Sequence, residues 1–139
     1  MIQPILSPML ALILWTFLIW VWMYATRIPA MQAAGLDPGK IKRKADLDVL
    51  PMSAQQVADN YNHLHEQPVL FYALVTWCVL AGTADSTNTT LAWAYVAIRV
   101  VHSLVQCTIN FVPVRFAIFA TGSIVLFVMG GRCLAALMG

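Results

Sequence analysis

The sequence predicts an all-α integral membrane protein, built as a four-helix bundle from one domain that covers residues 1–139. The first observation is composition, because 60% of the residues are hydrophobic. The second is charge, since only 10% of the residues are charged, against about 25% in soluble domains. The third is that the apolar residues gather in runs that approach the ~20 residues needed to cross a bilayer. What remains is one polar segment and two short gaps, too little for a separate soluble domain.

The first predicted helix covers about residues 5–27. Its apolar run extends from Ile5 to Ala25 and meets no charge before Arg27. This run exceeds the roughly 7 to 15 apolar residues of a secretory signal, and no basic segment precedes it, so we expect a retained membrane helix. Tryptophan and tyrosine favour the membrane interface, and several crowd towards the end of this helix, although the first of them can serve packing instead. They are Trp15, Trp20, Trp22 and Tyr24.

A polar, basic loop is predicted over residues 28–52, where glycines and prolines interrupt any helix. Most of the basic residues lie in or beside this loop, Arg115 lies beside the last connection, and the middle connection has none. Because cytoplasmic loops carry an excess of Lys and Arg, the first and third connections are expected in the cytoplasm and both termini outside it. The basic residues of the first loop are Arg27, Lys40, Lys42, Arg43 and Lys44.

The second helix is predicted over about residues 53–81. Ser53 and Gln56 have the spacing of a capping box, which indicates where this helix starts. Only the part beyond Pro68 is strongly apolar, so the first turns are expected to project into water. Pro68 removes a backbone donor, and we expect it either to kink the helix or to be tolerated in a packed membrane helix.

The third and fourth helices are predicted over about residues 91–111 and 114–137, separated by Pro113. The turn that precedes them is polar and uncharged apart from Asp85. The cysteines all lie inside apolar runs without the spacing of a metal site or a disulfide framework, so we expect inert buried thiols. They are Cys78, Cys107 and Cys133.

Polar side chains form a stripe on the third helix. Arg99 is expected near the middle of the bilayer, where a charged side chain costs about 2.5–3.5 kcal/mol and usually faces a partner, a cavity or a ligand. At 100° per residue, His102, Gln106 and Asn110 lie within about 60° of Arg99 on an otherwise apolar helix. This pattern predicts that the stripe faces the interior of the bundle.

A second polar stripe lies on the preceding helix, where Asp59, Asn62, His63 and Glu66 share one face. The two stripes predict a common polar interior, which serves either as interhelical hydrogen bonds of about 1 kcal/mol each or as a ligand site. A hairpin turning near Asp85 predicts that Glu66 and Arg99 differ in height by about 10 Å. The same estimate applies to His63 and His102.

Three segments carry a resemblance to a known family. They are HLHEQPVLFY at 63–72, RVVH at 99–102, and Asn110 with Arg115-Phe116. In these segments the protein resembles the MAPEG family of eicosanoid and glutathione metabolism, especially its bacterial members. Together with the order of the helices, the resemblance covers nearly the whole chain. The resemblance implies a homotrimer of four-helix subunits in a bacterial inner membrane. It also implies glutathione bound between neighbouring subunits near the cytoplasmic side.

The same resemblance implies roles for the polar residues. Glutathione carries two carboxylates and an ammonium group, which arginines and a glutamate can bind. A nearby cation stabilises the thiolate, the nucleophilic form of the thiol, and the resemblance gives this role to Arg115 and Arg27. It assigns glutathione binding to Asn62, His63, Glu66, Arg99, His102 and Gln106. The family usually has asparagine, an aromatic residue and tyrosine where this chain has His63, His102 and Gln106.

The expected function is that of a membrane-bound, glutathione-dependent transferase or peroxidase acting on lipophilic electrophiles. Its expected partners are further copies of the chain, membrane lipid and a lipophilic small molecule, with no nucleic acid and no metal. The alternative is a non-catalytic MAPEG-like membrane protein that binds a ligand or serves as a scaffold. A haem protein with His63 and His102 as axial ligands is disfavoured by their predicted height difference. A small multidrug exporter is disfavoured because the first helix lacks an acidic residue.

Overall fold

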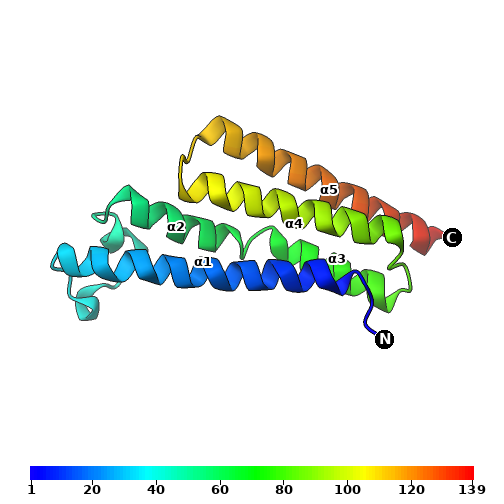
Figure 1. Ribbon diagram of the computed structural model, residues 1–139, viewed down its shortest axis with the longest axis horizontal. Helices are drawn as coiled ribbons and strands as arrows, with labels where there is room; N and C mark the ends of the chain where they lie inside the picture. Colours follow the sequence, from blue (N-terminus) through cyan, green and yellow to red (C-terminus); the bar gives the residue numbers. More distant parts are fainter.

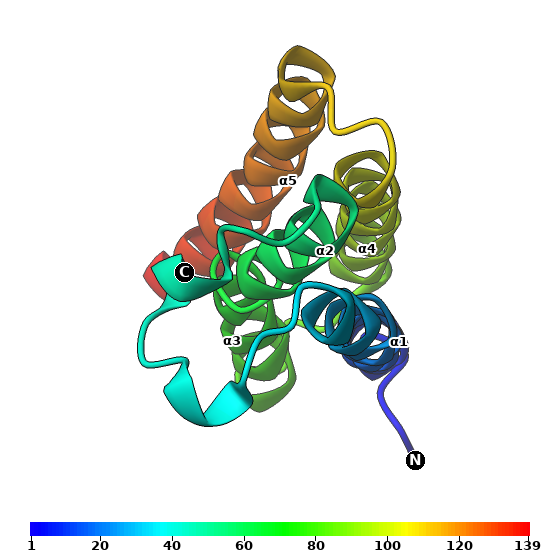
Figure 2. The ribbon, with the colours of Figure 1, turned by 90° about the vertical axis from the view of Figure 1, so that its left-hand side faces the viewer.

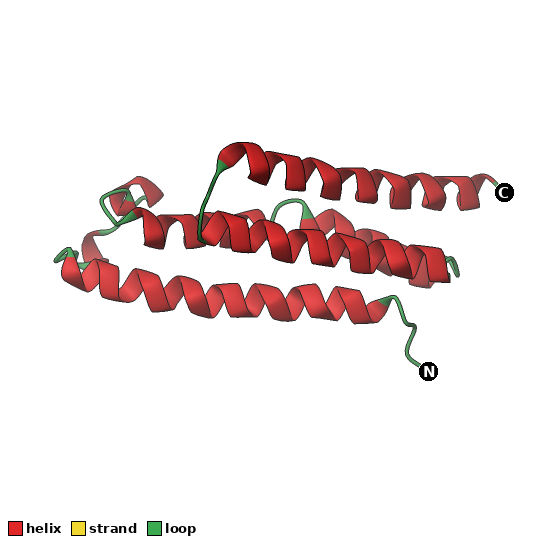
Figure 3. Ribbon diagram, turned by 45° about the horizontal axis from the view of Figure 1, so that its top comes forward, coloured by secondary structure: helices red, strands yellow, loops and turns green.

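The structure, a computed structural model, describes residues 1–139 and consists of helices and their connections, without strands (Figures 1 and 3). The α-helices are α1 (Leu6–Ala33), α2 (Met52–His63), α3 (Pro68–Leu80), α4 (Ser86–Cys107) and α5 (Val112–Met138). Two short 3₁₀ helices, η1 (Pro38–Lys40) and η2 (Lys44–Leu47), lie in the loop between α1 and α2.

The chain passes four times along the bundle, because α2 and α3 follow one another in the second passage (Figure 1). Both termini lie at one end, and the α1–α2 loop and the α4–α5 connection lie at the other. Helices α1, α4 and α5 are each long and apolar enough to cross a membrane. Helices α2 and α3 have only 12 and 13 residues and make the crossing together. The prediction of a four-helix membrane bundle is confirmed.

Helix α4 contacts every other α-helix of the bundle. It packs against α5 on one side and against α1 and α2 on the other, so α1 and α5 lie on opposite sides (Figure 2). Helix α3 contacts α5, whereas α2 does not. The bundle is therefore closed around α3 and open between α2 and α5.

Only 29 of the 139 residues are buried, and the exposed surface is rich in large apolar side chains. Helix α5 is the extreme case, because 17% of its most apolar stretch is buried. A soluble protein rarely exposes large contiguous apolar patches. The surface is therefore suited to lipid and to other apolar protein surfaces, as expected of an integral membrane protein.

Helix α1 is longer than predicted, because it continues past residue 27 and through Pro29. A proline in a helix removes one backbone hydrogen bond, and at this exposed position the flanking bonds are sufficient to continue the helix. The helix ends where Gly35 adopts a φ of 67° and Leu36 N donates to the Met31 carbonyl at 3.0 Å. This is a Schellman ending, which favours glycine because a side chain resists positive φ.

The prediction of one helix over 53–81 is wrong. The chain leaves helical geometry at Leu64–Gln67, and Pro68 is the first residue of α3. A proline at that position loses no helical hydrogen bond, because the first N–H groups of a helix have no partner in it. The sequence therefore produces a complete break in the second passage, where either a kink or a tolerated proline was expected.

The predicted capping box is also wrong. Helix α2 begins at Met52, one residue before Ser53, and its preceding residue Pro51 provides no side-chain cap. Gln56 Nε2 donates instead to the Cys107 carbonyl at 2.8 Å. That carbonyl belongs to the last turn of α4, where helical acceptors lack partners. Gln56 thus links the start of α2 to the end of α4.

Helix α4 begins at residue 86 and ends at 107, where 91 and 111 were predicted. Asp85 causes the early start, because its Oδ1 accepts a hydrogen bond from Asn88 N at 2.8 Å. The early end follows from Asn110, whose φ of 51° is left-handed and whose N–H donates to the Val105 carbonyl at 2.7 Å. Asparagine tolerates this conformation better than most residues.

Helix α5 begins at Val112, with Pro113 in its first turn. Near its other end, Arg132 donates to Asp85 Oδ2 at 2.6 Å and to Asn88 Oδ1 at 2.7 Å. These charge-assisted bonds tie α5 to the start of α4. The sequence did not single out Arg132, whose partners lie more than forty positions away.

Replacing Gly82 by alanine is expected to destabilise the fold. Gly82 has a φ of 69° and ends α3, where Thr83 N donates to the Cys78 carbonyl at 2.8 Å. A side chain in this left-handed conformation costs about 1–2 kcal/mol. Thermal unfolding in detergent, followed by circular dichroism, should show the loss for Gly82→Ala and a smaller loss for Gly82→Asn. Equal stability of the alanine variant and the wild type would contradict this account of the turn.

Asp46 organises the basic loop. Its Oδ2 accepts hydrogen bonds from Lys42 N at 2.9 Å and Arg43 N at 3.0 Å, which lower its pKa below the ordinary 3.8. A lowered folded-state pKa stabilises the loop above pH 3.8, and the stabilisation is lost as the pH falls through the folded value. At neutral pH, Asp46→Ala should speed hydrogen exchange at these two amides. Asp48→Ala is the control, because no hydrogen bond involves the Asp48 side chain.

Candidate functional site

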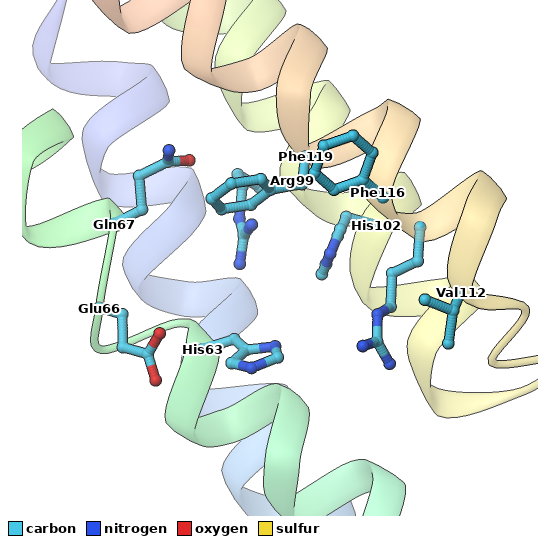
Figure 4. A pocket seen from close by; sticks show the side chains of 9 residues that line it. His63, Glu66, Gln67, Arg99, His102, Val112, Phe116 and Phe119 are labelled. Carbon is cyan, nitrogen blue, oxygen red and sulfur yellow. The ribbon is translucent and has the colours of Figure 1, made fainter.

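A cavity of about 300 Å³ lies where α2 and α5 diverge, between the break in the second passage, α4 and the first turns of α5 (Figure 4). We call it the central cavity. It is lined by His63, Glu66, Gln67, Arg99, His102, Val112, Arg115, Phe116 and Phe119. Five of these residues were predicted as site residues: His63, Glu66, Arg99, His102 and Arg115. The structure brings these five together in one subunit.

Arg99 is the most unusual residue of the central cavity. Its side chain is 1% exposed, yet Nε and Nη2 have no hydrogen-bond partner. The chain has two ion pairs, formed by Lys44 and Arg132, and Arg99 belongs to neither. A buried unpaired guanidinium is costly, because its hydration is lost and no anion replaces it. The cavity therefore presents a cation that lacks its anion.

The rings of His63 and His102 lie close together. Their ring centroids are 6.3 Å apart, and His63 Nδ1 lies 3.1 Å from Gln106 Oε1. The predicted height difference of about 10 Å is therefore wrong for this pair, because that estimate assumed an unbroken helix. His102 Nδ1 is buried without a partner and provides a second polar atom for a ligand.

Glu66 lies in the break between α2 and α3 and is exposed. Figure 4 shows its carboxylate directed towards the space that the Arg99 guanidinium and the His102 ring also face. Glu66 lies more than thirty residues before Arg99 and His102, which are both on α4. A carboxylate opposite a guanidinium is suited to a ligand that carries both an anionic and a cationic group.

Arg115 stands at the α5 side of the cavity and is half-buried. Its Nη1 donates to Asn110 Oδ1 at 2.5 Å, so the residue that ends α4 orients it. Asn110 was predicted to extend the polar stripe of the helix. In the structure it lies beyond the end of α4 and contributes by holding Arg115.

Gln67 is a cavity residue that the sequence did not indicate. Its Nε2 donates to Ser123 Oγ at 2.7 Å, and its Oε1 accepts from Tyr95 Oη at 3.1 Å. It thereby attaches the break between α2 and α3 to both α4 and α5. A polar residue directly before the proline was the available signal. Val112, Phe116 and Phe119 form an apolar wall of the cavity, and none of them was predicted as a site residue.

Arg27 and Asn62 are not in the central cavity. They line a second hollow of about 440 Å³ between the end of α1, the basic loop and α2, which we call the loop hollow. Asp59, on the predicted polar face of α2, lies 3.6 Å from Lys44 Nζ and is exposed. The helix face predicted as one stripe therefore divides between two sites.

The cysteines are free and buried. Cys78 and Cys133, on α3 and α5, have their Sγ atoms 3.6 Å apart, and Cys107 lies at the end of α4. No cluster of three His, Cys, Asp or Glu residues with the geometry of a metal site is present. The chemistry of the central cavity is therefore that of two arginines, two histidines, a glutamate and amides.

Comparison with known proteins agrees with the resemblance noted in the sequence. A model of the MAPEG family matches residues 5–135, nearly the whole chain. No curated protein and no solved structure matches it. The matched region contains the first three passages, nearly all of the fourth and every residue of the central cavity. The chain belongs to the MAPEG family.

Proposed function

We propose that this protein is a glutathione-dependent transferase or peroxidase of the membrane, which acts on lipophilic electrophiles. The observation that carries the proposal is the buried, unpaired guanidinium of Arg99 in an open polar cavity. A carboxylate of glutathione would supply the missing anion through charge-assisted hydrogen bonds. Family membership supports glutathione as the source of that carboxylate.

The other groups of the cavity match the rest of glutathione. Glu66 would receive its ammonium group, and the unpartnered Nδ1 of His102 would bond to a polar backbone atom. The remaining binding residues, His63 and Gln106, are bonded to each other and would position the ligand from the α2 side. Arg115 would face the thiol, because it is the second cation of the cavity. A guanidinium there favours the thiolate over the thiol.

The reaction follows from that thiolate. In a transfer, the sulfur attacks an electrophilic carbon, an S–C bond forms, and the leaving group departs with the bonding electrons while the thiol proton passes to water. In a peroxidase reaction, two glutathione molecules reduce a hydroperoxide to an alcohol and water and become a disulfide. Both require a substrate that reaches the cavity from the lipid side.

Apolar surface near the cavity supports such a substrate. Val112, Phe116 and Phe119 line it from α5, and all three are exposed. An entirely apolar groove of about 460 Å³ between α3 and α5 begins at Leu70, one turn from Gln67. A lipophilic electrophile could therefore approach along α5 without leaving an apolar environment.

We propose a homotrimer with glutathione held between neighbouring subunits. The central cavity, at about 300 Å³, is at the small end of the range of about 300–1,000 Å³ for ligand sites, and its exposed Glu66 leaves it open. Both features suit a site that a neighbour completes. The predicted roles of Arg27 and Asn62 towards glutathione would require them to act across such a boundary, because they line a different hollow of their own chain.

We propose that the basic loop faces the cytoplasm of a bacterial cell, with both termini on the outer side of the inner membrane. The positive-inside rule supports this orientation, since the basic loop and the start of α5, which contains Arg115, lie at the same end of the bundle. A variant that lacks the native cysteines and carries Lys40→Cys tests this orientation. Intact cells that express it are treated with a membrane-impermeant maleimide. Labelling in intact cells would contradict the orientation.

Isothermal titration of glutathione into the detergent-purified protein tests the function. Saturable binding, followed by conjugation of a lipophilic electrophile faster than in buffer, is the expected result. Binding without turnover across a panel of electrophiles and hydroperoxides would favour the non-catalytic alternative. The absence of binding would refute the proposal.

A further inference from the structure

The loop hollow is lined by more positive charge than the nearby carboxylates of Asp46 and Asp59 balance. Arg27, Lys42, Arg43 and Lys44 line it, and no lining residue is acidic. Lys44 alone has a carboxylate partner, at 3.6 Å from the exposed Asp59. Cations that converge in one concave site repel one another and raise the local concentration of anions. The hollow therefore has the electrostatics of an anion site.

The position of the loop hollow indicates which kind of anion it is suited to bind. It lies at the end of α1, where the apolar membrane stretch gives way to the basic loop. Met23, Ile41 and Leu47 also line it, so cations and apolar side chains share its walls. A free inorganic anion gains nothing from the apolar part. An amphipathic anion gains from both.

An apolar groove adjoins the loop hollow on the surface of α1. It has a volume of about 530 Å³ and shares Tyr24 with the hollow. Trp20 and Ile28 line it and are exposed, and the Trp20 and Tyr24 rings meet edge to face at 5.5 Å. Tryptophan and tyrosine favour the headgroup level of a bilayer. The positively charged hollow thus adjoins an apolar surface that extends along α1.

We propose that the loop hollow binds the phosphate headgroup of an anionic phospholipid, with an acyl chain along the Trp20–Ile28 face of α1. The cations contact the phosphate oxygens, and Arg27 does so with a planar fork suited to phosphate. This site is separate from the central cavity and does not depend on the proposed function. In this proposal Arg27 binds a lipid phosphate and does not activate the glutathione thiol in the central cavity of its own subunit.

The expected loss of lipid affinity follows from the number of basic residues that are removed. A basic residue near an anionic surface contributes about a fivefold preference, so removal of three should weaken binding roughly a hundredfold. The triple variant is Arg27→Gln, Lys42→Gln and Arg43→Gln. Lys40→Gln is the matched control, because Lys40 belongs to the same loop and does not line the hollow.

Native mass spectrometry of the detergent-solubilised protein, titrated with phosphatidylglycerol and in parallel with phosphatidylcholine, tests the site. We expect preferential retention of phosphatidylglycerol, lost in the triple variant and kept in Lys40→Gln and in Arg99→Gln. Circular dichroism checks that the triple variant is folded; if it is not, each single variant should show its own fivefold loss.

Three results would overturn the proposal. Equal binding of the two lipids would show that charge does not select the ligand. Equal losses in the triple variant and in Lys40→Gln would show that only the total charge of the loop matters. Binding of glycerol phosphate as tight as that of phosphatidylglycerol would identify a site for free phosphate without an acyl chain.

Discussion

Replacing Arg99 by glutamine is expected to weaken glutathione binding by about thirtyfold or more. Loss of one partner of a buried charge pair costs about 2–5 kcal/mol, and each 1.4 kcal/mol is a factor of ten in Kd. The neutral amide is shorter and cannot form the bidentate bond of a guanidinium. Isothermal titration of wild type and variant measures the difference. Arg43→Gln makes the same chemical change in the loop and should leave the affinity for glutathione unchanged.

The thermal stability of a variant at Arg99 gives a second, independent measurement. Because the Arg99 guanidinium is buried and unpaired, Arg99→Leu should unfold at a temperature at least as high as the wild type when no ligand is present. Glutathione at a hundred times Kd should stabilise the wild type by about 2.7 kcal/mol and the variant not at all. A variant that is destabilised without ligand, yet binds glutathione normally, would identify Arg99 as purely structural.

Replacing Arg115 by glutamine is expected to lower kcat/KM by about a hundredfold with a much smaller change in glutathione affinity. Removal of one group that stabilises a developing or nucleophilic anion costs about 10²–10³ in rate. Without the guanidinium the thiolate is less favoured, so the pH at which half the maximal rate is reached should move upward. Initial rates of conjugation across pH 6–9 measure both effects.

Two controls separate this role of Arg115 from a structural one. Asn110→Gly removes the hydrogen bond to Arg115 and keeps a residue that accepts the φ of 51°. It should lower the rate less than Arg115→Gln does, because the guanidinium loses its orienting partner but stays in the cavity. Arg115→Lys keeps the charge and should recover part of the rate that glutamine loses. An unshifted pH profile in Arg115→Gln would contradict activation of the thiol by this residue.

The four passages, the basic end of the bundle and four of the cavity residues were predictable from local sequence, whereas Arg115 was assigned to the site by the family resemblance. Apolar runs, glycine and proline at connections, and polar residues at helical spacing are all read within about twenty positions. Arg99 was found in this way, because a charge inside an apolar helix is rare whatever its surroundings.

Helix boundaries were predicted less well, since several depend on competing local signals. Ser53 and Gln56 had the capping-box spacing, but Gln56 bonds to the end of α4. Asp85 was an equally local cap that was read as part of a turn. At the start of α2 a tertiary hydrogen bond of Gln56 replaced the local cap, whereas at the start of α4 the local cap of Asp85 was used.

Pattern and composition thus determined by themselves that the chain crosses a membrane four times, which end is basic and which helix faces bear polar groups. Only the tertiary structure decided which of those groups meet. The break at Leu64–Gln67 brings the ring of His63 close to that of His102, and the separation of α2 from α5 opens the cavity in which Glu66 faces Arg99. Which residues of two helices face each other depends on where a helix is interrupted and on how each helix packs against its neighbours. Helical periodicity, being local, carries no information about either.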